Sequence, residues 1–76
     1  MIQIDLKLFV TLSKYSPKNS ECLKIPEETT VEKLIADLGI PSDLVKLIFI
    51  NGKMQDLNYL LKHNDRVGLF PPVGGG

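Results

Sequence analysis

The chain has 76 residues, of which 43% are hydrophobic, and nine basic and nine acidic side chains give it a formal net charge of zero. This length fits a single domain, and the lack of a basic excess argues against nucleic-acid and membrane-surface partners. The longest apolar run, residues 47–50, is too short to span a bilayer, and the first ten residues lack the features of a signal peptide, so we expect a cytoplasmic protein.

The N-terminal half begins with a clear strand pattern. Apolar residues alternate with polar ones from Ile2 to Leu8, which predicts a strand with one buried face. Residues 13–20 are polar and contain a proline, as expected of a hairpin connection. Residues 22–25 then predict a second, short strand that Pro26 ends.

A helix is predicted from Thr29 onward. Thr29 and Glu32 have the spacing of a capping box, in which each side chain satisfies a backbone amide at the helix start. Gly39 is a natural left-handed stop, and Pro41 prevents continuation. The helix should therefore be about three turns long, with its apolar stripe packed on the sheet. The stripe consists of Val31, Leu34, Ile35 and Leu38.

The C-terminal half predicts three strands and a helical turn. Residues 46–50 form the third strand, and Asn51-Gly52 indicates a type I′ turn, because both central positions of that turn need positive φ. Lys53-Met54 would be a brief fourth strand. Residues 56–61 predict a helical turn with Leu57, Leu60 and Leu61 pointing inward, and residues 66–70 form the last strand.

This order of elements predicts an α+β fold, a mixed sheet of four to five strands with one main helix packed across it. It resembles the β-grasp, or ubiquitin-like, fold, in which the first and last strands are central neighbours. We expect residues 1–70 to form this domain and residues 71–76 to form a flexible tail.

Glycine dominates the end of the chain, where Gly74, Gly75 and Gly76 follow Val73. Pro71-Pro72 should end the last strand and stiffen the base of the tail, and the six residues from position 71 can reach at most roughly 20 Å. A carboxylate on Gly76 would be sterically open and could enter a narrow active site on another protein. The alternative is a frayed end or an expression scar without function.

The sheet face opposite the helix is predicted to be unusually apolar, which favours a docking surface over loops that cover it. Phe9 and Phe70 should lie there, together with either Leu47 and Phe49 or Ile48 and Ile50. We assign the last pair to the docking face. The residues expected to contact partners are thus Phe9, Ile48, Ile50, Phe70, Pro71, Pro72, Val73 and Gly74.

No catalytic constellation or metal site is predicted within the domain. Cys22 is the only cysteine and His63 the only histidine, which excludes an internal disulfide and a thiolate metal cage. We interpret Cys22 as a small apolar strand residue and His63 as a solvated loop residue.

Three stretches together resemble the family of sulfur carriers that contains the small subunit of molybdopterin synthase and the thiamine sulfur carrier (MoaD/ThiS type). They are the first strand through residues 9–12, residues 50–53, and the run Phe70-Pro71-Pro72-Val73-Gly74-Gly75-Gly76. The last stretch resembles the molybdopterin branch more than the thiamine branch. The chain departs from the family pattern at two places. The loop after Leu12 is compact and less acidic than in the family, and Gly74 stands where a small polar residue is common.

The resemblance implies a carrier and not an enzyme. An ATP-using adenylyltransferase of the ubiquitin-activating type would activate Gly76, with Gly75 beside it, and a sulfurtransferase would supply sulfur. The product would be a covalent 1-thioglycine, a thiocarboxylate, with no cofactor bound by the chain. The large subunit of molybdopterin synthase, or another sulfur-accepting enzyme, would then take the sulfur.

Three alternatives stay open at this point. The chain could carry sulfur for thiamine or another metabolite. It could be a ubiquitin-like modifier that forms isopeptide bonds through Gly76, or an interaction domain with an inert tail.

Overall fold

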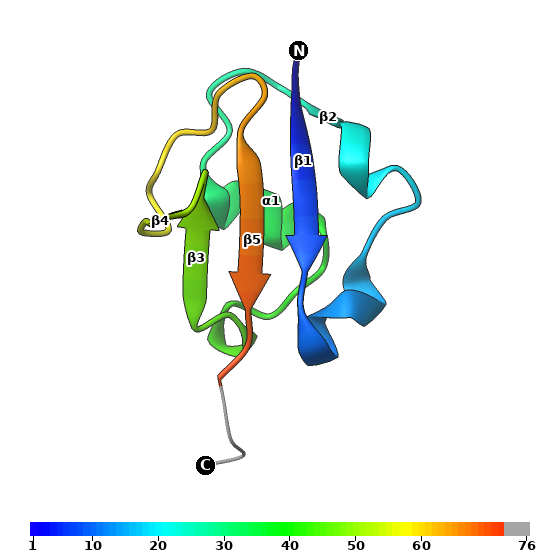
Figure 1. Ribbon diagram of the computed structural model, residues 1–76, viewed down its shortest axis with the longest axis vertical. Coiled ribbons are helices and arrows are strands. Elements are labelled where there is room, and N and C mark those ends of the chain that lie inside the picture. Colours follow the sequence, from blue (N-terminus) through cyan, green and yellow to red (C-terminus); the bar gives the residue numbers. More distant parts are fainter. Residues whose placement is uncertain (73–76) are drawn as a thin grey trace.

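The computed structural model describes residues 1–72, which form a five-stranded mixed sheet with one α-helix across one face (Figure 1). The strands are β1 (Ile2–Leu8), β2 (Leu23–Ile25), β3 (Leu47–Ile50), β4 (Lys53–Met54) and β5 (Arg66–Phe70), and the helix is α1 (Val31–Asp37). Short 3-10 helices occur at Val10–Tyr15, Ser20–Cys22 and Ser42–Leu44.

The sheet order is β2-β1-β5-β3-β4, so the first and last strands are central neighbours. β1 and β5 run parallel, with Asp5 opposite Arg66 and Leu8 opposite Leu69. β3 runs antiparallel to β5 and β2 antiparallel to β1. The β-grasp topology and the central pairing of the first and last strands are confirmed.

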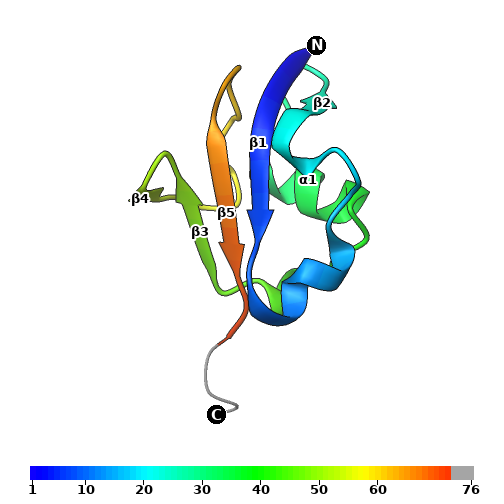
Figure 2. The same ribbon diagram turned by 45° about the vertical axis from the view of Figure 1, so that its right-hand side comes forward.

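One face of the sheet and the apolar side of α1 enclose the core, and Figure 2 shows the helix lying against that face. Alternation along the strands decides which side chains enter it, because successive side chains point to opposite faces. The buried set is Ile4, Leu6, Leu12, Ile25, Val31, Leu34, Ile35, Ile40, Ile48, Ile50, Leu61, Val67 and Leu69.

The helix is shorter than predicted, and its cap is one residue later. Seven residues make about two turns. Thr30 is the N-cap, since its hydroxyl accepts a hydrogen bond from the Lys33 N–H at 3.1 Å. The Thr29 hydroxyl instead donates to the carbonyl of Pro26 at 2.6 Å. Gly39 ends the helix with φ of +79°, as predicted.

Residues 56–61 do not form the predicted helical turn. The segment lies beside the start of α1, where Val31 N–H donates to the Tyr59 carbonyl and Glu32 N–H to the Leu57 carbonyl. It thereby satisfies two of the amides that a helix start leaves without partners. Of the three leucines, only Leu61 is buried, whereas Leu57 and Leu60 are exposed.

Two other local predictions differ in outcome. Asn51 and Gly52 both have positive φ, of 54° and 84°, so the tight turn between β3 and β4 is confirmed. Cys22 is exposed and lies in a 3-10 helix just before β2, so its assignment as a strand residue was wrong.

Candidate functional site

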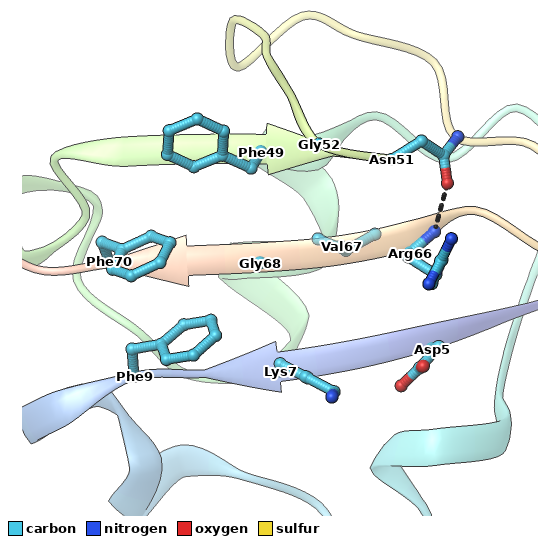
Figure 3. Close-up of a pocket in the computed structure, with 10 residues that line it drawn as sticks. All are labelled: Asp5, Lys7, Phe9, Phe49, Asn51, Gly52, Arg66, Val67, Gly68 and Phe70. Carbon is cyan, nitrogen blue, oxygen red and sulfur yellow. Dashed lines mark hydrogen bonds between the residues drawn. The ribbon is translucent and has the colours of Figure 1, made fainter.

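A groove crosses the sheet face that α1 does not cover (Figure 3). It has a volume of about 480 Å³ and lies over β1, β5 and β3. The residues that line it are Asp5, Lys7, Phe9, Phe49, Asn51, Gly52, Arg66, Val67, Gly68 and Phe70.

Three phenylalanines form the apolar end of the groove. The rings of Phe9 and Phe70 are stacked, with centroids 4.2 Å apart and planes within 1° of parallel. Phe49 meets Phe70 edge-on at 5.6 Å. Aromatic pairs in such geometries contribute about 0.5–1.5 kcal/mol beyond the area that they bury. The three rings therefore form a preorganised apolar surface where β5 ends.

Gly68 makes room for this cluster. It sits in the middle of β5, opposite Phe49 in the register, and a Cβ built on it would lie 3.4 Å from a ring carbon of Phe9 and 3.8 Å from one of Phe70. A glycine inside a strand often marks a place where another group approaches closely. Here the missing side chain lets the Phe9 ring lie against the strand and leaves the floor of the groove open.

Charged side chains gather at the opposite end of the groove. Asp5 of β1 lies opposite Arg66 at the start of β5, and Lys7 lies opposite Gly68, between Asp5 and the Phe9 ring in Figure 3. The Oδ1 atom of Asp5 is buried and receives no hydrogen bond from any residue in 1–72.

A hydrogen-bond network fixes the geometry of this charged end. The Asn51 side chain donates to Asp65 at 2.9 Å and accepts from the Arg66 N–H at 2.9 Å. The other carboxylate oxygen of Asp65, a residue only 5% exposed, accepts from Lys62 N–H at 2.8 Å. The turn after β3 is thus tied to the start of β5. Sequence reasoning identified the Asn-Gly turn but missed this second role of Asn51.

The structure brings Phe9 and Phe70 together as predicted and corrects the choice in β3. Ile48 and Ile50 are 6% and 2% exposed and face α1, so they cannot line the docking face. Leu47 and Phe49 lie on the other face of β3, and both are half-buried.

The predicted tail is described only at its start. Pro71 is buried and Pro72 is exposed. Val73, Gly74, Gly75 and Gly76 lie outside the described residues, and so do the predictions made for them. His63 is exposed, and its Nδ1 accepts a hydrogen bond from Gln3 N–H at 3.1 Å. Within residues 1–72, no helix is long and apolar enough to cross a membrane.

A comparison with protein families shows the family of the chain. The model of the ThiS family matches residues 6–76. The chain belongs to the ThiS family. Members of this family are small ubiquitin-like sulfur carriers, which work with activating enzymes and sulfur-accepting synthases. The family resemblance predicted from the sequence is therefore confirmed.

Solved structures similar to this ThiS-family chain share its fold. A Pyrococcus furiosus protein, provisionally assigned as molybdopterin converting factor subunit 1, is 25% identical with a TM-score of 0.73, covering 96% of this chain and 100% of its own. Small archaeal modifier protein 1 of Haloferax volcanii is 21% identical with a TM-score of 0.71, and the match covers 96% of this chain and 100% of that protein. The H. volcanii protein HVO 2177 is 22% identical with a TM-score of 0.76, and the match covers 99% of this chain and 87% of that protein. A search of curated proteins finds no match.

Proposed function

We propose that this protein carries sulfur as a thiocarboxylate on Gly76 and donates it in molybdopterin synthesis. The observation that carries the proposal is the ThiS-family match, which extends through the Gly-Gly pair at positions 75 and 76. The P. furiosus relative, assigned as a molybdopterin converting factor subunit and 25% identical over its full length, supports the molybdopterin branch.

The proposed chemistry begins with activation, because a carboxylate is a poor electrophile. An adenylating partner joins the Gly76 carboxylate to the AMP portion of ATP and releases pyrophosphate. The terminal sulfur of a persulfide then attacks the acyl carbon and displaces AMP. A thiol reduces the remaining S–S bond and frees the thiocarboxylate. This sulfur forms a C–S bond with the precursor on the synthase as an oxygen leaving group departs from that carbon. Water then cleaves the acyl–sulfur bond, which leaves the sulfur on the product as a thiol and restores the Gly76 carboxylate.

The described residues support this role through the position of the groove. β5 forms the floor of the groove and continues directly through Phe70 into Pro71-Pro72. A partner that rests on the phenylalanine cluster therefore sits beside the base of the tail. Docking at a fixed place next to a reacting group lowers the entropic cost of bringing the reactants together. The body would thus position the tail, and the terminal glycines would react.

Intact mass spectrometry tests the proposal. The protein is incubated with ATP, a sulfur source and the activating enzyme of its host, and the terminal peptide is then isolated. We expect a mass gain equal to the replacement of one oxygen by sulfur, localised to that peptide. Deleting Gly75 and Gly76 together, which leaves no terminal Gly-Gly pair, should abolish the gain while the circular dichroism spectrum stays unchanged. Gly74→Ser is the matched control, because it alters the tail but keeps the terminal pair, and it should still be loaded.

Incubating the loaded protein with a sulfur acceptor or with host proteins separates the other uses of an activated glycine terminus. Sulfur transfer to a pterin precursor supports the molybdopterin assignment, whereas transfer to a thiazole precursor places the chain in thiamine synthesis. Higher-mass conjugates on lysines indicate a protein modifier. Normal loading of the chain that lacks both Gly75 and Gly76 would refute the mechanism.

A further inference from the structure

We propose that the groove binds an extended segment of a partner protein that carries an apolar side chain and an acidic side chain two residues apart. The apolar side chain rests on Gly68 among the three phenylalanines, and the acidic one lies between Lys7 and Arg66. The inference rests on the proposed function only in taking the occupant to be a protein that docks the carrier.

The apolar end has the shape that a single side chain needs. Gly68 offers no side chain of its own, and Phe9, Phe49 and Phe70 surround it at ring-to-ring distances of 4.2 and 5.6 Å. Phe9 is held in place because its N–H donates to the Leu69 carbonyl at 3.1 Å. A rigid apolar pocket that is already formed binds a side chain with little ordering cost. It therefore selects a leucine-like or aromatic side chain.

The charged end selects an acid. Lys7 and Arg66 are exposed, and within residues 1–72 neither forms an ion pair. Among the side chains that line the groove, these two cations face the single carboxylate of Asp5, which gives the lining a net positive charge. The nearby Asp65 carboxylate is buried and already accepts hydrogen bonds from Asn51 and the Lys62 N–H. An acidic side chain of an incoming extended segment neutralises the excess cation.

The spacing of the two ends fixes the pattern of the partner. Arg66 and Gly68 are two residues apart on one face of β5, which corresponds to about 7 Å along a strand. An extended segment lying along β5 presents its residues i and i+2 on one face with the same spacing. The pattern is therefore apolar–any–acidic, read in either chain direction.

The experiment is a titration of the ¹⁵N-labelled full-length protein, followed by amide chemical shifts. The probes are end-blocked peptides with the sequences Gly-Leu-Ser-Glu-Gly and Gly-Glu-Ser-Leu-Gly, and the same peptides with Lys in place of Glu. We expect one Glu peptide to shift the amides of Lys7, Gly68 and Phe70. Its Lys counterpart should bind about fivefold more weakly, since an exposed ion pair contributes up to about 1 kcal/mol.

A charge-reversal variant of the protein, titrated with the same peptides, is the second part of the experiment. Arg66→Glu should reverse the preference between the Glu and Lys peptides, while Lys18→Glu, an equal charge change in an exposed loop outside the groove, should leave it unchanged. The fold should survive Arg66→Glu, because Asn51 contacts only backbone atoms of this residue. Equal binding of the two peptide types, absence of shifts, or shifts mapped away from the groove would overturn the inference.

The mass assay on Gly76 stays independent of this titration. Selective peptide binding without sulfur loading would support the inference about the groove and refute the sulfur-carrier proposal. Sulfur loading without selective peptide binding would support the sulfur-carrier proposal and refute the inference about the groove.

Discussion

Replacing Gly68 by alanine should make the free protein more stable and a poorer docking partner. Gly68 has no positive φ, so alanine can adopt its backbone conformation, and the added methyl carbon would lie 3.4 Å from Phe9, an ordinary contact distance. A glycine inside a strand costs roughly 0.5–1 kcal/mol relative to alanine, because it loses more conformational freedom on folding. For a domain of this size, that gain should raise the melting temperature by about 2–8 °C.

The same methyl group fills the floor of the groove. A partner side chain seated there must shift, and forcing extra methyl groups into a packed contact costs about 1–3 kcal/mol. We therefore expect the KM of the activating enzyme for the carrier to rise about tenfold, which corresponds to about 1.4 kcal/mol. Thermal unfolding by circular dichroism and steady-state kinetics of sulfur loading measure the two effects.

Gly39→Ala is the matched control. A Cβ at Gly39 meets nothing within 4 Å, but the residue has φ of +79°. The left-handed conformation costs a side-chain-bearing residue about 1–2 kcal/mol, so the protein should lose stability while its KM stays unchanged. A Gly68→Ala protein that melts lower than the parent, or that is loaded with an unchanged KM, would refute the reasoning about the groove floor.

Two further substitutions test the docking face and the helix start. Phe70→Glu should weaken docking at least tenfold, as for other central aromatic residues of interfaces, with a smaller stability loss of about 1–3 kcal/mol from the broken ring contacts; a collapse of the melting temperature would instead place Phe70 in the core. Thr30→Ala should cost about 0.5–2 kcal/mol in denaturant unfolding because it removes the cap on Lys33 N–H. Thr30→Ser should restore most of that stability, and equal losses in both variants would contradict the assigned cap.

Local chemistry made some of the fold predictable. Asn51-Gly52 and Gly39 were placed correctly, because positive φ is a property of one or two residues and leaves a direct mark in the sequence. The alternation in β1 also predicted which of its faces is buried, since only one of its faces is apolar.

Other features depend on partners distant in the sequence. All four residues of β3 are apolar, so alternation could not decide which pair faces α1. Pairing with β5 decides it, because Ile48 lies opposite Leu69 and Ile50 opposite Val67, both of which are buried. The leucines after β4 had helical spacing, yet their segment gives its carbonyls to the start of α1. For the groove, the signal was a glycine in the middle of an apolar strand.

The parallel pairing of β1 and β5 also determines how the molecule resists being pulled apart. A motor that grips the chain beyond Phe70 while the other end is held loads these two strands along their length in opposite directions. The register from Asp5 opposite Arg66 to Leu8 opposite Leu69 then bears the force in shear, so its hydrogen bonds must break together and not one after another. Forced unfolding follows the rate of such a barrier and not the equilibrium stability. A domain of marginal stability can therefore be mechanically strong along the axis on which its tail is pulled.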